Sequence, residues 1–272
     1  MAAYAMMAEH DSTHTANLPP LARDIPLHVQ EILAGFQNRI AKVLRRIGCL
    51  DGLEMFASEH CLPHQFLGFV QKAMDLFDES SRFFVNYLRR NGQAIPCEEG
   101  CAHCCQNMPA GASSVELLYF YHGMHQSGAF ARLFRRSMEA EQVLTQLFLQ
   151  CQDKLGGSMA ATGEDCRDQV LQLYQGLGRP CGFSRDHLCQ LYPYRPFACR
   201  LHYSLSPAFW CNPGHFQFPH ALIINLVPSE CVYEALDRIE RRLQMRLSGV
   251  LVCGLLELTV NVMHFDRIRW TH

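Results

Sequence analysis

The sequence predicts a mainly α-helical protein with little β structure, in which helices enclose an irregular, cysteine-rich metal-binding core. Apolar residues recur at helical spacing over several long stretches. No internal repeat and no strand–helix–strand alternation is visible. Fourteen cysteines are present, and eight of them fall in segments rich in glycine and proline, which favour loops.

We expect four regions along the chain. They are a flexible N-terminal arm over residues 1–23, a helical region over 24–92, the cysteine-cluster core over 93–215, and a helical region packed on that core over 216–272.

The first two helices are bounded by proline and glycine. Asp24 can cap the first helix, Pro26 suits its first turn, and Gly48 is a plausible stop. A second helix is expected over Pro63–Arg90, and Asn91-Gly92 should end it.

The remaining helices follow the first cysteine cluster. Ser113 and Glu116 have the spacing of a capping box, which opens a helix. Prolines exclude long helices from the second cysteine segment. Further expected elements are helices over 129–154 and 164–175, a linker over 156–163, a short strand over 220–227, a helix from Pro228, and a buried helix over 250–265.

Composition excludes several classes of protein. The formal net charge is −2 with acids and bases interspersed, which argues against nucleic-acid binding. No apolar run reaches membrane-spanning length, and the N-terminus lacks the features of a secretory signal. We therefore expect a cytoplasmic protein without a membrane segment. In that reducing compartment, many cysteines favour metal ligation or redox chemistry over disulfides.

Eight loop cysteines are the candidate metal ligands, since thiolates bind zinc and iron well. Gly100 permits a tight backbone approach in the first cluster, where Cys101 and Cys104 can present two sulfurs to one metal. The eight candidates are Cys97, Cys101, Cys104, Cys105, Cys181, Cys189, Cys199 and Cys211.

Adjacent Cys104 and Cys105 leave two arrangements open. Consecutive side chains usually diverge, so both rarely bind one small ion. The eight cysteines build either two neighbouring four-cysteine sites or one polynuclear cluster. The other six lie in or beside helical patterns and are expected to be small buried hydrophobes: Cys49, Cys61, Cys151, Cys166, Cys231 and Cys253.

Polar residues beside the second segment have two interpretations. Tyr192, Arg195 and Arg200 can offset the negative charge of several thiolates, or recognise a substrate carboxylate or peptide terminus. For Glu116 the first interpretation is a helix cap, and the second is a catalytic acid or base. Three loop histidines could replace a cysteine as ligands: His202, His215 and His220.

Together, the two cysteine segments resemble the YkgJ-type cysteine-cluster family of zinc- or iron-chelating proteins. The first family motif, C-x3-C-x2-CC, is met by Cys97 to Cys105. The second is met by CGFS at Cys181 and by CQLYPYRPFACR over 189–200. Gly182, Ser184 and Leu191 depart from the family pattern. The resemblance covers about residues 96–212.

This resemblance implies a metal but leaves the reaction open. The flagellin lysine methylase group has a similar cluster, associated with an iron–sulfur centre and methyl transfer from S-adenosylmethionine. An iron–sulfur cluster such as [4Fe–4S] is therefore the first expected cofactor, a zinc or iron ion the second, and S-adenosylmethionine a further candidate. A protein or peptide is the candidate substrate. The alternatives are a zinc-stapled interaction module without catalysis and, last, metal storage.

Overall fold

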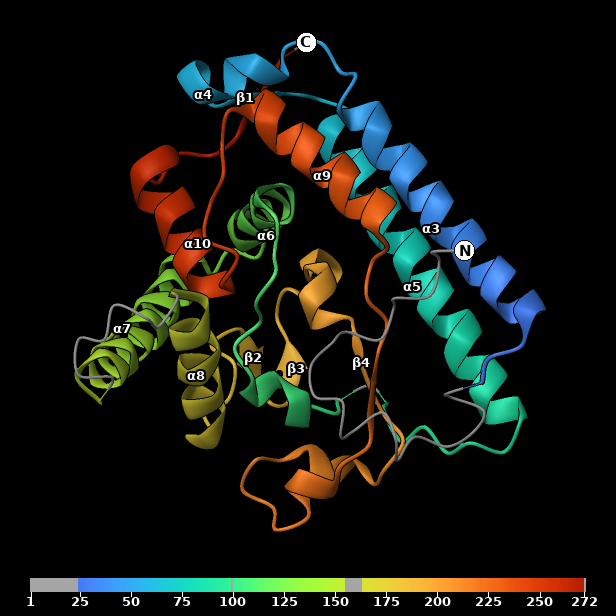
Figure 1. Cartoon of the computed structure of the whole chain (residues 1–272). Helices are drawn as coiled ribbons and strands as arrows, with labels where there is room; N and C mark the ends of the chain where they lie inside the picture. The colour runs from blue at the N-terminus through green and yellow to red at the C-terminus, as the bar shows by residue number, and fades with distance from the viewer. Residues whose placement is uncertain (1–23, 99, 155–162, 272) are drawn as a thin grey trace.

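A computed structural model of the chain describes residues 24–98, 100–154 and 163–271. Helices account for 61 % of the structure and strands for 7 %, which confirms the predicted mainly α fold (Figure 1). The short strands pair in three separate two-stranded sheets within the described residues. The protein is therefore organised by helix packing rather than by a central sheet.

The α-helices are α3 (Leu27–Ile47), α4 (Phe56–Glu59), α5 (Phe66–Arg90), α6 (Ser114–Gln126), α7 (Phe130–Lys154), α8 (Gly163–Gly176), α9 (Glu230–Leu243) and α10 (Leu251–Glu257). The strands are β1 (Cys61–Pro63), β2 (Ser184–Arg185), β3 (Leu188–Cys189), β4 (His202–Ser204), β5 (Ile223–Asn225) and β6 (Arg269–Thr271). Short 3₁₀ turns are η1 (Leu53–Met55), η2 (His103–Gln106), η3 (Tyr192–Tyr194), η4 (Phe197–Cys199), η5 (Ala208–Cys211) and η6 (Phe218–His220), and a π-helical turn, η7 (Leu258–Val262), follows α10.

The C-terminal ends of the first two long helices, α3 and α5, lie where the sequence predicts them. Pro26, rather than Asp24, occupies the cap position of α3. Gly48 follows the last residue of α3, and Gly92 takes a left-handed φ of 84° just beyond α5. The predicted start of α5 at Pro63 is wrong, because Cys61–Pro63 pairs in parallel with Arg269–Thr271 as a strand.

Farther along the chain, helices α7 and α8 lie where they are predicted, and β5 lies within the predicted strand. The C-terminal helix is shorter than predicted, because α10 ends at Glu257 and the π-helical turn replaces its last part. The expected arm over 1–23 lies outside the described residues, and so does the expected linker over 156–163 except for Gly163, which begins α8.

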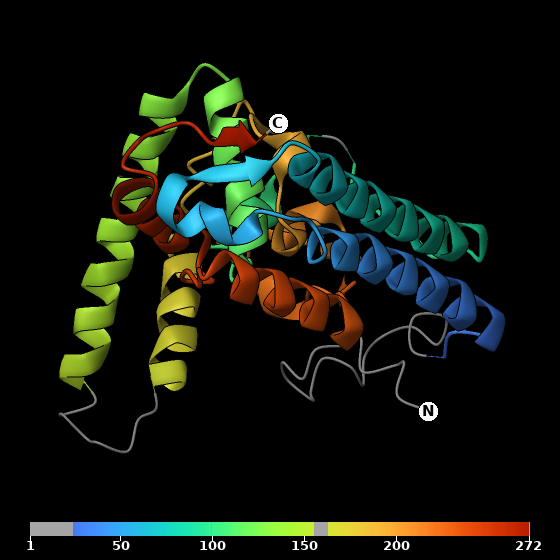
Figure 2. The same ribbon diagram turned by 90° about the horizontal axis from the view of Figure 1, so that it is seen from above.

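Two helical layers flank a buried central helix. Helices α3, α5 and α9 pack side by side in one layer, and α7 packs against α8 and α10 in the other (Figures 1 and 2). Helix α6 lies between them and is apolar nearly all round, which is typical of a fully buried helix. This arrangement accounts for the large hydrophobic core.

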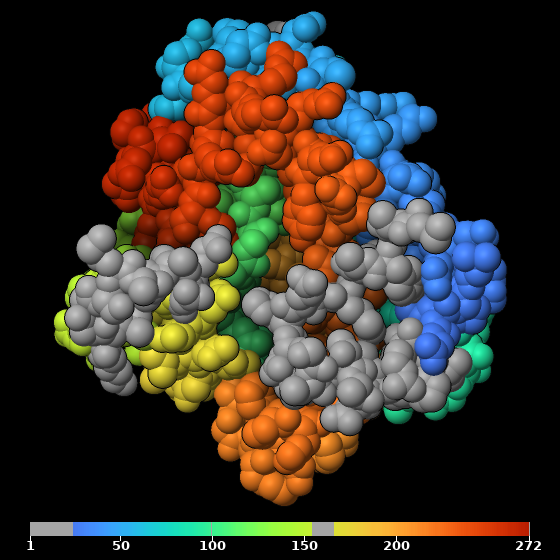
Figure 3. All heavy atoms as spheres, in the orientation of Figure 1, coloured from blue at the N-terminus to red at the C-terminus, as the bar shows by residue number. Residues whose placement is uncertain are grey.

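The cysteine-bearing loops gather on one side of these helices (Figure 1). The segment over 205–222 projects beyond the rest of the molecule in the space-filling view (Figure 3). It exposes Phe209 and Phe216, the latter 79 % exposed. Among the described helices, none combines the length and apolar character required to cross a bilayer.

Candidate metal centre

The eight candidate ligands come from three stretches of chain that meet in space. Cys97 and Cys101 lie in the loop before η2, and η2 carries Cys104 and Cys105. Cys181 lies just before β2, and three downstream elements carry the rest: Cys189 on β3, Cys199 in η4 and Cys211 in η5. All eight are half-buried free thiols.

Backbone hydrogen bonds bring Cys105, Cys181 and Cys189 together. The N–H of Cys181 donates to the carbonyl of Cys105 at 2.8 Å, and the N–H of Ser184 donates to Cys181 at 2.9 Å. Ser184 in β2 then pairs with Cys189 in β3. The tight turn between these strands uses positive φ at both central residues, as two-residue hairpins prefer.

Four thiols in this region act on one another electrostatically, and we name them the Cys105 group: Cys105, Cys181, Cys189 and Cys199. Burial raises the pKa of Cys181 to about 12, and the neighbouring charges of Cys105 and Cys189 add to the rise. Burial also raises the pKa of Cys199 well above its usual value, and Cys181, Cys189 and Cys105 raise it further. These sulfurs are therefore near enough to act on one another's ionisation.

Another four thiols form the Cys97 group: Cys97, Cys101, Cys104 and Cys211. Ser204 lies beside two of them: its N–H donates to Sγ of Cys97 at 3.1 Å, and its side chain opposes the rise that burial causes in the pKa of Cys211. Turn η2 packs against η5, which carries Cys211. Burial raises the pKa of Cys97, and the charges of Cys101 and Cys211 raise it further.

Adjacent Cys104 and Cys105 connect the two groups. Their thiols share a hydrogen bond, so these consecutive side chains do not diverge as the sequence argument assumed. Donation from Cys104 lowers the pKa of Cys105 to about 7, and the charge of Arg195 lowers it too. The same hydrogen bond raises the pKa of Cys104, because it stabilises the protonated thiol that donates it.

Arginines lie beside both groups. The guanidinium of Arg195 lies 3.6 Å from the ring centre of Tyr192 and lowers the pKa of Cys105. Arg200 is only 6 % exposed; it pairs with Asp78 on α5 and donates to the carbonyls of Pro193 and Arg195.

Two further residues beside the thiols are not apparent from the sequence pattern. Arg89, at the end of α5, donates to the carbonyl of Ile95 at 2.8 Å, and its charge lowers the pKa of Cys97. Ser204 is the other, since its contacts with Cys97 and Cys211 need the folded chain.

The remaining candidates make ordinary structural contacts. Glu116 completes the predicted capping box with Ser113 and is buried. His202 hydrogen-bonds to Asn225 across the β4–β5 pair. The ring of His215 lies against Phe209 and Phe216 in the projecting segment, and His220 ends the short turn η6.

Cysteines outside the loops vary in exposure. Cys151 and Cys166 are buried, as expected, and contact each other across α7 and α8. The expectation for Cys49 is wrong, because it lies exposed in the turn after α3. Cys61, Cys231 and Cys253 are half-buried.

The thiol groups match a thiolate-bound metal in donor type and number. Four thiols are what a structural zinc or an iron–sulfur cluster uses, and an N–H···S hydrogen bond such as that from Ser204 is typical of the shell around such centres. Over residues 24–98, 100–154 and 163–271, no three His, Cys, Asp or Glu side chains already stand close enough to hold one metal ion. Ligation would therefore require the thiols of each site to move closer together.

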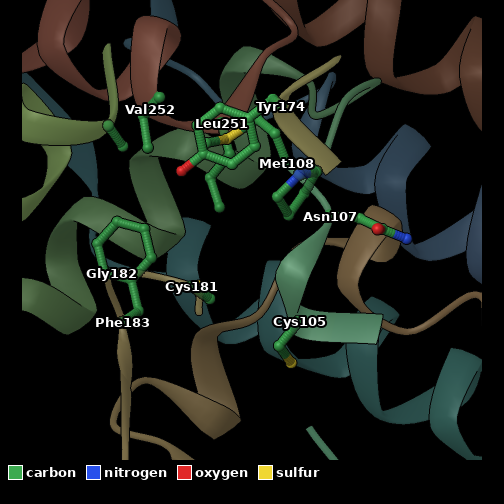
Figure 4. A pocket seen from close by; sticks show the side chains of 11 residues that line it. Cys105, Asn107, Met108, Tyr174, Cys181, Gly182, Phe183, Leu251 and Val252 are labelled. Atoms are coloured by element: carbon green, nitrogen blue, oxygen red, sulfur yellow. The ribbon is translucent and has the colours of Figure 1, made fainter. Parts of the chain in front are cut away.

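A small pocket adjoins the Cys105 group (Figure 4). Cys105 and Cys181 line one end, and Tyr174, Leu251 and Val252 line the other. Its volume of about 10 Å³ is enough for roughly one water molecule. As it stands, this pocket has no room for an organic substrate.

Comparison with known proteins gives no assignment: no protein-family model matches the sequence, and neither a curated protein nor a solved structure matches the chain.

Proposed function

We propose that this protein is a metalloprotein that binds an iron–sulfur cluster, or a zinc or iron ion, through its eight loop cysteines. One observation carries the proposal: three separate stretches of chain bring these eight thiols into a single region beside positively charged arginines. Gathering eight thiols without metal or disulfide bonds would be an unusual use of cysteine.

Iron–sulfur is our first choice. Cytosolic zinc modules tend to use repeated C-x2-C pairs, and this chain has one such pair among the loop cysteines, Cys101 and Cys104. The hydrogen bond from Ser204 N–H to Sγ of Cys97 suits an iron–sulfur centre, whose potential such bonds tune, and it suits a zinc thiolate equally. A bound cluster would supply electron transfer or, with an open iron, a binding position. The proposal also places the protein in a reducing compartment such as the cytoplasm, where its thiols would stay reduced.

As an enzyme, the protein would modify another protein or a peptide. This proposal depends on the resemblance to the YkgJ-type family and to the flagellin lysine methylase group, which makes S-adenosylmethionine a candidate methyl donor. On this chain, Tyr192 is 53 % exposed and Arg195 is held over its ring. These two side chains could therefore face a substrate on one side and the thiols on the other.

A zinc-stapled interaction module is the second candidate. The small size of the pocket beside Cys105 and Cys181 favours it, because a closed structural site needs no room for a substrate. The exposed Phe209 and Phe216 would give such a module an apolar surface for a protein partner.

Elemental analysis and a visible absorption spectrum of protein purified without air test the two candidates. Iron with acid-labile sulfide and a brown colour that bleaches in air would support the first. S-adenosylmethionine binding would then be measured by calorimetry. Stoichiometric zinc with no visible band would support the second. A protein without bound metal would refute both, provided that iron or zinc added to the reduced protein also fails to bind.

A further inference from the structure

We infer that the eight cysteines form two separate four-thiol metal sites, with the Cys97 group in one and the Cys105 group in the other. This inference rests on the proposed function and adds the assignment of ligands to each centre. The alternative is a single polynuclear cluster shared by all eight.

Contacts within the Cys105 group involve every one of its members. Cys181 N–H bonds to the Cys105 carbonyl, and the β2–β3 hairpin turns Cys189 back beside Cys181. Nη1 of Arg195 donates a hydrogen bond to the backbone carbonyl of Cys199 at 3.5 Å. Electrostatic interactions join every pair of thiols in this group.

Contacts within the Cys97 group run through Ser204 and η5. The N–H of Ser204 bonds to Sγ of Cys97, and its side chain acts on Cys211, although these cysteines are far apart in sequence. Cys101 interacts electrostatically with Cys97, Cys211 and Cys104. The ligands of this site would thus come from both ends of the loop region.

The two groups pack on different parts of the protein. Cys97 packs against a smaller hydrophobic cluster at the far ends of α3 and α5. Cys181, Cys189 and Cys199 pack against the main core.

Neighbouring Cys104 and Cys105 would then divide between the two sites. Both lie in the 3₁₀ turn η2 and their thiols contact each other, so the two sites would adjoin at this pair. Ferredoxins offer a parallel, since one short cysteine run there supplies ligands to two clusters. Two centres joined by adjacent ligands would lie close enough for electron exchange.

Metal stoichiometry of paired variants tests this division. The full chain would be made as wild type, Cys211→Ser, Cys199→Ser and the double variant, with Cys49→Ser as an exposed control. Zn²⁺ binding to the reduced protein would be measured by competition with a coloured chelator. We expect two equivalents for wild type and control, one for each single variant and none for the double variant.

Other stoichiometries would overturn the assignment. A single cluster shared by all eight cysteines would lose its whole metal content in either single variant. If Cys104→Ser and Cys211→Ser together remove both equivalents, the ligands are wrongly grouped, because both belong to the Cys97 group. A wild-type protein that binds no metal refutes the proposed function itself, and the inference with it.

Cysteine protection on the wild-type chain provides a test without substitutions that weaken the fold. Protein loaded with one equivalent of Zn²⁺ would be alkylated with N-ethylmaleimide and mapped by mass spectrometry. Protection in complete sets of four, divided as proposed, supports the inference. Protection that joins Cys97 with Cys181 in one set contradicts it.

Discussion

The backbone N–H of Phe197 donates a 2.6 Å hydrogen bond to Oε1 of Glu116, which lies 81 residues earlier in the chain. Oε2 of the same carboxylate accepts hydrogen bonds from the N–H and hydroxyl of Ser113, each at 2.7 Å. A single buried side chain therefore caps α6 and anchors the turn that carries Cys199. Complete burial raises the pKa of Glu116, and these hydrogen bonds oppose the rise.

Glu116→Ala should lower the free energy of unfolding by about 2–4 kcal/mol, because it removes a cap and leaves the Phe197 N–H without its partner. Urea unfolding followed by circular dichroism would measure the loss. Glu139→Ala, at an exposed position on α7, is the control and should change stability by less than about 0.5 kcal/mol. Equal midpoints for both variants would show that Glu116 has no structural role.

Arg200→Ala should destabilise the fold by about 1.5–3 kcal/mol, because a buried guanidinium then no longer bonds to Asp78 and two carbonyls. Asp78→Ala should destabilise the fold at least as much, because it leaves the guanidinium of Arg200, whose side chain is only 3 % exposed, without its counter-ion. Chemical unfolding of both variants, with metal content measured alongside, is the test. A fully stable Arg200→Ala protein would favour a substrate-binding role for this arginine.

Arg195→Ala should weaken metal binding in the Cys105 group by about tenfold, with little loss of stability. Its charge lowers the pKa of Cys105, Cys189 and Cys199, so its removal disfavours their thiolates. Arg195→Lys keeps the charge and should recover most of the affinity. Zinc competition at constant pH would measure both. Unchanged affinity in Arg195→Ala would instead favour recognition of a substrate.

Gly123→Ala should destabilise the protein by about 1–3 kcal/mol, because a Cβ at this position of α6 would overlap the ring of Tyr194. Tyr194 lies between Cys189 and Cys199 in the sequence, so displacing its ring should shift this segment and weaken metal binding too. Gly35→Ala is the matched control, since a Cβ there meets no atom within 4 Å and α3 should gain about 0.5–1 kcal/mol. Thermal unfolding of the two variants should therefore shift in opposite directions.

His125 should make stability fall as the solution becomes acidic. Its Nε2 is buried without a hydrogen-bond partner among the described residues, and burial lowers its pKa, with Arg267 and His122 adding to the effect. The folded state thus binds the proton less readily than the unfolded state. Its stabilising contribution is complete above about pH 6.5 and decreases as the pH falls below that value.

Unfolding of His125→Phe at pH 7.5 and 5.5 tests this sign. Phenylalanine does not titrate and can still pack on Phe130, whose ring lies 4.1 Å from that of His125. The variant should lose less stability on acidification than wild type does. His28→Phe, at an exposed position, is the control. An identical pH dependence in wild type and His125→Phe would contradict the prediction.

Local rules read from the sequence determine where the helices lie. Gly48 and the Asn91–Gly92 pair stop α3 and α5, and Ser113 with Glu116 opens α6, because these effects act within a few residues. The same rules keep the second cysteine segment free of long helices, since its prolines leave only short 3₁₀ turns and short strands there. They also name the eight cysteines as candidates, though not their grouping.

Only the tertiary structure decides which residues meet. Pairing of Cys61–Pro63 with Arg269–Thr271, the bond from Arg200 to Asp78, and the contacts of Ser204 with Cys97 and Cys211 all join distant segments. No local preference encodes such contacts, because they depend on how whole helices pack and on which loops are thereby brought together. The sequence by itself thus determines the helices and the set of thiols. The packing of α3, α5 and α6 around the loops determines which thiols are neighbours.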